Sequence, residues 1–289
     1  NNKLRSLEMI LGSDFKRAKI DDQDIYKISE YVGLLNVVVF VPDDLYLIKG
    51  SPNNRRRFID LELSKISPIY VFNLSKYNNL LKERNKYLKI LNQKNRDGDE
   101  YLEVLDEQMA RLQVELIKKR IDFIKNLNQK VTSIYNLIAK NDNEKISLRY
   151  SCFLKQELTY ENILALYKKN HQRDIRYMQS HLGIHKDDLK IFMNGNAADL
   201  FASQGQQRTI VLSLKIALIE LIKDEIGEYP VLLLDDVLSE LDEARKNMLL
   251  DILNQKIQTF ITTTSIDGIN HQIVEKAKKI YIKGGKEAT

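Results

Sequence analysis

The sequence predicts an α/β protein in which a buried parallel sheet is interrupted, along the chain, by a pair of long antiparallel helices. Two segments, 34–42 and 231–234, are unbroken apolar runs, as is typical of parallel strands that are buried on both faces. Between them, residues 69–140 carry leucines at helical spacing and contain few residues that break helices. The chain is therefore expected to fold as an α/β core with a helical insertion.

The first 68 residues contribute the opening part of the predicted core. The strand at 34–42 is followed by two carboxylates, Asp43 and Asp44. A turn then leads into a helix that opens with three consecutive arginines: Arg55, Arg56 and Arg57. Carboxylates at a strand end can bind a metal ion or its waters, and guanidinium groups can bind the phosphates of a nucleotide or of DNA. A helix N-cap and a solvated basic turn are the alternative interpretation.

The helical insertion is predicted to form a projecting arm. Leu74, Leu81 and Leu88 repeat at a spacing of seven, and apolar residues continue at three-four spacing after residue 102. The turn sequence at 95–98 separates two helices of roughly 25 residues each, which gives an arm of about 40 Å. Beyond Arg120 the spacing changes phase, so the second helix is expected to leave its partner and pack on another neighbour.

Less specific patterns follow the arm. The sequence predicts a strand at 145–154, a helix at 160–179 and a β-hairpin over 183–195, since Asn-Gly at its end is a strong hairpin signal. His185 with Asp187 could contact a metal or a nucleotide, but a structural histidine beside a turn is the more common case. Cys152 lies in a strand pattern and is expected to be a buried, inert thiol.

The segment 201–242 has the most specific pattern. A polar turn at 203–207 opens a long apolar helix from about residue 209 to 226, so that free backbone N–H groups and the positive end of the helix dipole face outward. The strand at 231–234 then ends in adjacent carboxylates, Asp235 and Asp236, which suggests a metal site at the edge of the sheet. A second polar turn at 239–242 follows, and after one more helix a strand at 259–264.

In this order, these motifs resemble the ABC-type ATPase heads of the SMC class, and within that class a member that acts in bacterial recombinational DNA repair. The ABC signature is matched by Ser203, Gln204, Gly205, Gln206 and Gln207. The D-loop is matched by Ser239, Glu240, Leu241 and Asp242, the Walker B strand by 232–236, and the switch strand by 262–264. An aspartate, Asp236, stands where most such ATPases carry a glutamate, and a threonine where many carry a histidine, which is consistent with slow hydrolysis.

The resemblance implies ATP and Mg²⁺ as cofactors. Asp235 would bind the metal, with Asp43 and Asp44 as further candidates, while Asp236 and Thr263 would act in hydrolysis. The signature would contact ATP held by a second copy of the chain. The implied protein is an ATP-dependent homodimer that clamps single- or double-stranded DNA in repair and replication restart, with partners of the RecR and RecO type. The arginines at 55–57 would contact DNA or phosphate.

The implied domains are a head formed by 1–68 and 180–289 and an inserted arm at 69–179. No GxxxxGK[ST] motif occurs in the sequence, so the phosphate-binding loop is expected in a segment before residue 1, and the 289 residues alone are expected to be inactive. A structural, cohesion-like head that only dimerises with nucleotide is the main alternative, but an arm of about 40 Å is short for that role. A transporter ATPase is a weaker alternative because the arm differs from the small helical subdomain of such subunits.

Composition agrees with a folded protein that acts on an anionic partner. The chain is 43% hydrophobic and 29% charged, with a formal net charge of +5. Residues 71–140 carry 14 Lys and Arg against 9 Asp and Glu, a surplus that equals the charge of the whole chain. No motif for reading base edges is present, so DNA contacts are expected to go to phosphates, through the arginines at 55–57 or through the basic arm. One cysteine, the absence of a signal peptide and the absence of a long apolar run predict a cytoplasmic protein.

Overall fold

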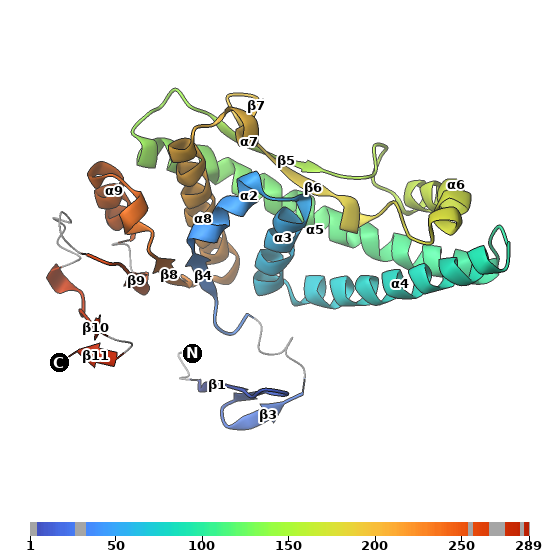
Figure 1. Cartoon of the computed structure of the whole chain (residues 1–289), viewed down its shortest axis with the longest axis horizontal. Coiled ribbons are helices and arrows are strands. Elements are labelled where there is room, and N and C mark those ends of the chain that lie inside the picture. The colour runs from blue at the N-terminus through green and yellow to red at the C-terminus, as the bar shows by residue number, and fades with distance from the viewer. Residues whose placement is uncertain (1–4, 27–32, 254–256, 266–274, 284–285, 289) are drawn as a thin grey trace.

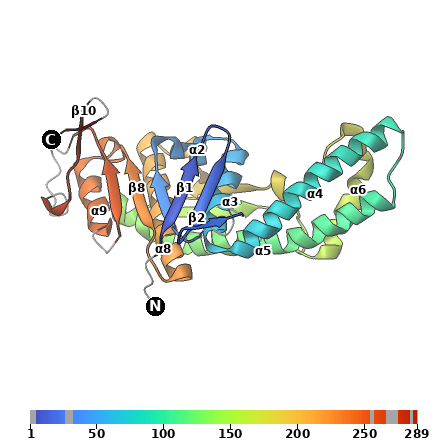
Figure 2. The same cartoon turned by 90° about the horizontal axis from the view of Figure 1, so that it is seen from below.

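The computed structural model describes residues 5–26, 33–253, 257–265, 275–283 and 286–288. Its centre is a three-stranded parallel sheet in the order β4-β8-β9 (Figures 1 and 2). The strands are β4 (Val37–Phe40), β8 (Val231–Asp235) and β9 (Thr259–Thr262). Phe40 pairs with Leu234, and Asp235 pairs with Thr262, so the carboxyl ends of all three strands meet at one edge.

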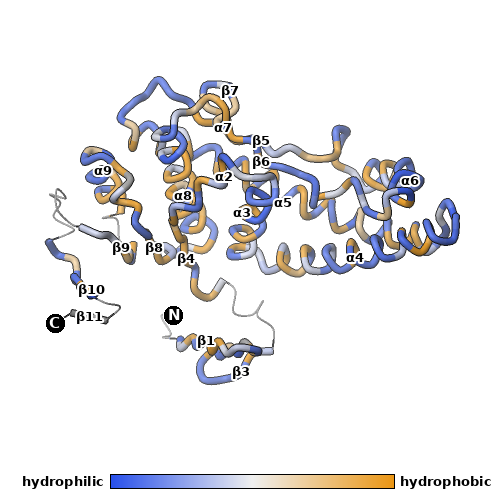
Figure 3. The backbone as a smooth tube through the Cα atoms, viewed as in Figure 1, coloured by the Kyte–Doolittle hydropathy of each residue, from blue (hydrophilic) through white to orange (hydrophobic). Residues whose placement is uncertain are grey.

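The long helix α8 (Gln204–Ile226) is the most buried element beside this sheet. Hydrophobic residues lie along most of its length, whereas α4 (Pro68–Gln93) alternates between hydrophobic and hydrophilic residues (Figure 3). On the strands, Val38 and Leu232 are buried, but Val39 is 38% exposed, so the prediction of burial on both faces is wrong for β4. Successive side chains point to opposite faces, and only one face is fully covered within the described residues. The helix starts five residues earlier than its apolar pattern suggested, because Ser203 caps it at Gln204.

Two antiparallel helices, α4 and α5 (Glu100–Ala139), extend from the core to one side (Figure 1). The expectation of about 25 residues per helix fits α4 with 26 residues, but α5 is longer, with 40 residues. Lys130, in the second half of α5, forms ion pairs with Glu220 and Asp224 of α8. The first part of α5 therefore packs on α4, and the remainder packs on the core.

A second sheet joins segments that are distant in sequence. Its strands are β5 (Ile146–Ser151), β6 (Asp188–Met193) and β7 (Asn196–Ala197), which pair antiparallel in that order. Asn194 and Gly195 both have positive φ angles, 50° and 82°, as the tight β6-β7 turn requires. Residues 184–186 form a short 3-10 helix, η2, and not the strand that the hairpin pattern suggested. β5 lies in the predicted arm (69–179) and β6 in the predicted head (180–289), yet the two strands pair in one sheet. The division into head and arm at residue 180 therefore stays a proposal.

The remaining elements are short or peripheral. An antiparallel sheet near the N-terminus contains β1 (Leu7–Leu11), β2 (Lys16–Ile20) and β3 (Gln23–Ile25), and the C-terminal pair is β10 (Tyr281–Lys283) with β11 (Lys286–Ala288). The other helices are η1 (Pro42–Leu45), α2 (Tyr46–Lys49), α3 (Pro52–Ile66), α6 (Tyr160–Tyr177), α7 (Ala198–Phe201), η3 (Leu238–Glu240) and α9 (Glu243–Leu253). Within the described residues, no helix is both long enough and apolar enough to cross a membrane.

Candidate functional site

The edge where the three parallel strands end holds the predicted catalytic carboxylates. Asp235 is the last residue of β8 and is exposed. Its Oδ1 accepts a hydrogen bond of 2.5 Å from the Thr262 hydroxyl at the end of β9. Open parallel sheets bind their ligands at this edge. Asp235 is thus an accessible carboxylate, held in place by a neighbouring strand, of the type that Mg²⁺ uses as one of its few protein ligands.

Asp236 has an unusual backbone and an unpaired carboxylate oxygen. Its φ angle is +53°, which a non-glycine residue adopts only where surrounding contacts enforce it. The contacts here are hydrogen bonds of 3.2 Å from its N–H to the carbonyl and the hydroxyl of Thr262. Its Oδ1 is buried and has no hydrogen-bond partner in the described part of the chain. An oxygen in this state is suited to accept a proton or to hold a water molecule.

The switch strand differs from the prediction in one residue. Thr263, the predicted catalytic threonine, donates its hydroxyl to the Ser265 carbonyl at 2.8 Å. Thr262 is the residue that contacts both Asp235 and Asp236. Three threonines in a row give no sequence signal for which one faces the neighbouring strand, whereas the β8-β9 register places Thr262 opposite Asp235.

The predicted D-loop forms the link between β8 and α9. The Ser239 hydroxyl donates to the Asp236 carbonyl at 2.7 Å, and Leu241 is buried. Asp242 accepts a hydrogen bond of 2.9 Å from the Arg245 N–H, so it caps α9. Glu240 is the last residue of η3. In this conformation, the Asp242 side chain caps α9 and contacts no other predicted site residue in the described part of the chain.

The predicted signature is the N-terminus of α8. Ser203 and Gln206 form a capping box, in which each side chain bonds to the backbone N–H of the other residue. Gln206 also donates to Glu144 at 2.7 Å, and the buried Gln207 donates to the carbonyls of Ala198 and Ala202. Ser203 and Gln204 remain exposed, and Gly205 is partly exposed. The turn therefore presents a hydroxyl and free backbone N–H groups to the surface.

The signature turn at Ser203 and the strand edge at Asp235 are separated along the direction of the α8 axis. Lys215 of α8 donates to the Val39 carbonyl at 2.8 Å, which places it level with the middle of the sheet. Lys215 is eleven residues beyond Gln204, or about 16 Å along the helix axis. Asp235 is two residues beyond Leu233, the β8 partner of Val39, so at least roughly 10 Å separates Asp235 from Gln204 along that axis. One phosphate oxygen bound by Asp235 could therefore not also be in hydrogen-bond contact with Ser203 of the same chain.

The predicted additional metal ligands are placed differently from Asp235. Asp44 forms an ion pair of 2.8 Å with the buried Lys215 and accepts a bond from the Val41 N–H, so its carboxylate is already occupied. Asp43 is exposed in η1. Among the residues that the structure describes, no group of three or more acidic, histidine or cysteine side chains could hold a metal ion. Asp235 is the better placed of the three predicted ligands.

The three predicted arginines of α3 have different environments. Arg55 makes a two-bond ion pair with Asp188, at 2.7 and 3.0 Å, and donates a third bond to the Gly50 carbonyl at 2.7 Å. Its side chain is buried, so it is engaged within the protein and shielded from DNA. Burial by itself would raise the pKa of Asp188, but hydrogen bonds from Arg55 and Lys190 outweigh it and lower that pKa. Arg57 is exposed, and Arg56 is partly exposed with one bond to the Asp187 carbonyl. The phosphate-contact prediction is therefore retained for Arg56 and Arg57 only.

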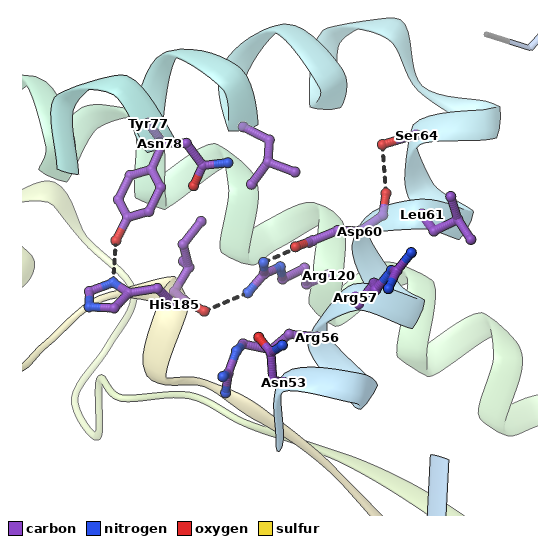
Figure 4. Close-up of a pocket in the computed structure, with 12 residues that line it drawn as sticks. Asn53, Arg56, Arg57, Asp60, Leu61, Ser64, Tyr77, Asn78, Arg120 and His185 are labelled. Carbon is purple, nitrogen blue, oxygen red and sulfur yellow. Dashed lines mark hydrogen bonds and ion pairs between the residues drawn. The ribbon is translucent and has the colours of Figure 1, made fainter. Parts of the chain in front are cut away.

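Arg56 and Arg57 line a cavity of about 460 Å³ between α3, α4 and η2, which we call the α3 pocket (Figure 4). Its floor is the buried Arg120 of α5, which donates to Asp60 at 2.7 Å and to the Ile184 carbonyl at 2.9 Å. No pattern in the sequence marks Arg120 as a pocket residue, because its place in the pocket depends on Asp60 and Ile184, which are far away in the chain. Asn53 and Asn78 add exposed amides to the rim.

His185, also in the α3 pocket, has a structural environment. Its Nδ1 accepts a bond of 2.8 Å from the Tyr77 hydroxyl, and its Nε2 donates to the Ser180 carbonyl at 3.1 Å. Burial lowers the pKa of His185 to about 4, so the ring is neutral at pH 7. Asp187 accepts bonds from the Tyr150 hydroxyl and the Phe153 N–H, and burial raises its pKa. Both residues support the structural interpretation over a metal or nucleotide contact.

Comparisons with known proteins place this geometry in a family. No protein-family model matches the chain. The chain is 44% identical over 287 residues to the DNA replication and repair protein RecF of Macrococcus caseolyticus, covering 98% of this chain and 78% of the relative. The chain belongs to the RecF family. The RecF protein of Geobacillus sp. is 41% identical over 285 residues, covering 97% of this chain and 76% of that relative.

A solved RecF structure shows the same fold. The structure described as the recombination mediator protein RecF-ATPrS in the RecFOR pathway is 32% identical and superposes with a TM-score of 0.84. It covers 92% of this chain and 72% of that one. A second structure, described as RecF-ATP in the same pathway, also has a TM-score of 0.84. The fold is therefore that of an ABC/SMC-type ATPase head with helices extending from it, as the motif order predicted.

Proposed function

We propose that this chain is an ATP-dependent DNA-binding protein of recombinational repair and replication, and that ATP joins two copies of it on DNA. The observation that carries the proposal is the strand edge, where Asp235 and Thr262 are bonded and the Asp236 carboxylate oxygen is left unpaired. The RecF relatives named for DNA replication and repair, and the structure described as RecF-ATP, support the same assignment.

In this proposal, the strand edge performs the chemistry. Asp235 fits as a Mg²⁺ ligand because it is exposed, anionic and fixed by the Thr262 hydroxyl. When bound, Mg²⁺ would neutralise charge on the phosphates of ATP. Asp236 would orient the attacking water and accept its proton, for which its unpaired Oδ1 is suited. Thr262, and not Thr263, would position the two aspartates, since it is hydrogen-bonded to both. The resemblance had implied Thr263 as the catalytic threonine.

The signature would act across the dimer interface. Ser203 and Gly205 sit at an exposed helix N-terminus that favours anions, yet they lie roughly 10 Å from Asp235 along α8. A phosphate bound at the strand edge of one copy could instead meet this turn in a second copy. This arrangement makes the two sites of a homodimer equivalent, and it makes dimerisation depend on the γ-phosphate.

The proposed DNA contact is electrostatic. Arg57 and the free donors of Arg56 can bind backbone phosphates, which carry no sequence information. Binding would therefore be similar for different sequences and would weaken steeply with salt. Partners of the RecR and RecO type are part of the proposal and are supported by the RecFOR description of the RecF structures.

Salt titration of DNA affinity tests this function in the 289-residue chain. Fluorescence anisotropy with labelled duplexes of two unrelated sequences should give similar affinities and a linear fall of log affinity with log salt. Arg57→Glu should reduce the slope by about 1, because one phosphate contact is lost. Lys119→Glu, an equal charge change at an exposed position of α5, is the matched control and should leave the slope unchanged. An affinity that does not change with salt would overturn the electrostatic contact.

A further inference from the structure

From residue 78 onward, one face of α4 carries only amide and lysine side chains at heptad spacing. We call this set the α4 stripe: Asn78, Lys82, Asn85, Lys89 and Asn92. At 3.6 residues per turn the five positions fall within a sector of about 80° on the helix. Leu88 and Leu91, outside this sector, are buried against the rest of the arm. The stripe is thus a continuous polar face with two cations and no acid.

The donors of this stripe are available to a ligand. Lys82 and Lys89 are exposed, and neither forms an ion pair with another described residue. Asn85 accepts bonds of 2.8 Å from the N–H and the hydroxyl of Ser180 through its Oδ1, which leaves its amide N–H groups as donors. The neighbouring carboxylate of Glu83 points to a different partner, the Tyr101 hydroxyl. A face of this kind complements an anion.

The stripe ends at a cationic pocket on each side. Asn78 lines the α3 pocket, together with Arg56 and Arg57. Asn92 lines a second cavity of about 660 Å³ at the far end of the arm, which we call the arm-tip pocket. In the arm-tip pocket three exposed arginines, Arg96, Arg173 and Arg176, surround one acid, Asp97. None of these three arginines pairs with a carboxylate within the described parts of the chain. Figure 1 shows α3, which carries Arg56 and Arg57, and α6, which carries Arg173 and Arg176, at opposite ends of α4.

We infer that the α4 stripe is a track for the sugar-phosphate backbone of DNA, with the α3 pocket and the arm-tip pocket as its two ends. Asn78 and Asn92 are fourteen residues apart, or about 21 Å along the helix. One strand of a duplex places a phosphate every 3.4 Å along its axis, so about six base pairs would lie on the stripe. Two lysines a heptad apart, with arginines beyond both ends of the stripe, fit a linear polyanion better than they fit a compact ligand. This inference rests on the proposed function, whose arginine contact at Arg57 it extends along the arm.

Charge reversal on the stripe tests the track. In the 289-residue chain, Lys82→Glu with Lys89→Glu should reduce the slope of log affinity against log salt by about 2 and weaken duplex binding at low salt. Lys76→Glu with Lys119→Glu is the matched control, because Lys76 lies on the opposite face of α4 and the change in charge is the same. The control should keep the wild-type slope. Duplexes shorter than about six base pairs should lose affinity in the wild type more steeply than in the stripe variant.

The outcomes separate the track from the function on which it rests. If the wild type shows no salt-dependent DNA binding, the proposed function fails. If the wild type binds but the slope of log affinity against log salt falls equally in both double variants, binding depends on net charge only. The track is then overturned. If the stripe variant binds DNA like the wild type but loses binding to polyglutamate, the stripe belongs to an acidic protein partner, and the track is again overturned. Circular dichroism of both variants establishes that α4 remains folded.

Discussion

At the scale of single residues, burial decides the chemistry of His185. The sequence allowed a metal-binding or nucleotide-binding histidine, but the structure bonds both ring nitrogens, to Tyr77 and to the Ser180 carbonyl. The nearby cations of Lys186 and Arg56 add to the effect of burial and oppose a further positive charge. A neutral His185 holds η2 against α4, and with it the wall of the α3 pocket.

This environment predicts a pH dependence of stability. The pKa of His185 is about 4 in the folded chain against 6.5 in the unfolded chain, so the unfolded state binds more protons between these values. The free energy of unfolding should therefore fall as pH drops from 6.5 to 4, by about 3 kcal/mol from this residue. His185→Gln should remove that part of the slope in urea titrations at pH 7.0, 6.0 and 5.0. Identical slopes in the variant and the wild type would show that the pKa of His185 does not change on folding.

Among the residues of the strand edge, some could be predicted from the sequence and others could not. Asp235 and Asp236 could be identified because they end an apolar strand, and the strand edge is where ligands bind. The choice between Thr262 and Thr263 could not be made, since it depends on the register of β9 against β8. Asp44, like Asp235, is a carboxylate close to the end of an apolar strand. Its carboxylate is nevertheless paired with Lys215, which is 171 positions away in sequence.

At the scale of elements, the Arg55–Asp188 pair links α3 to β6. The two residues are 133 positions apart, so no local pattern could indicate that the first of three arginines is structural. Elements with local signals were predictable, including α4 and the Asn-Gly turn before β7. The 40 residues of α5 were less so, because its second half is stabilised by packing on α8.

Removal of Arg55 should therefore destabilise the fold. Arg55→Ala leaves the Asp188 carboxylate buried with only Lys190 as a cationic partner, which should lower the free energy of unfolding by about 3 kcal/mol at pH 7. Arg57→Ala, two positions away and exposed, should change it by less than about 0.5 kcal/mol. Urea unfolding followed by circular dichroism measures both. Equal stability of the two variants would mean that Arg55 is not a structural residue.

At the scale of the whole molecule, the proposed ATP site would be completed by residues from two copies of the chain. The strand edge with Asp235 and the signature turn at Ser203 are held apart by α8, which also anchors the second half of α5. Because α8 contacts both the central sheet and the second half of α5, a change at the proposed nucleotide site would reach the arm through α8 and α5. The order of motifs along the chain indicated this head, but the contact of α5 with α8 came from the structure.

Sedimentation velocity with and without ATP tests this trans arrangement most directly. The measurement uses a chain in which these 289 residues are joined to a phosphate-binding loop, because no GxxxxGK[ST] motif occurs among them. Asp236→Asn should still dimerise on addition of ATP while hydrolysis slows by about a hundredfold or more, since only proton transfer is lost. Ser203→Arg should bind ATP as a monomer but lose dimerisation and hydrolysis together. A Ser203→Arg protein that dimerises with ATP like the wild type would contradict the account.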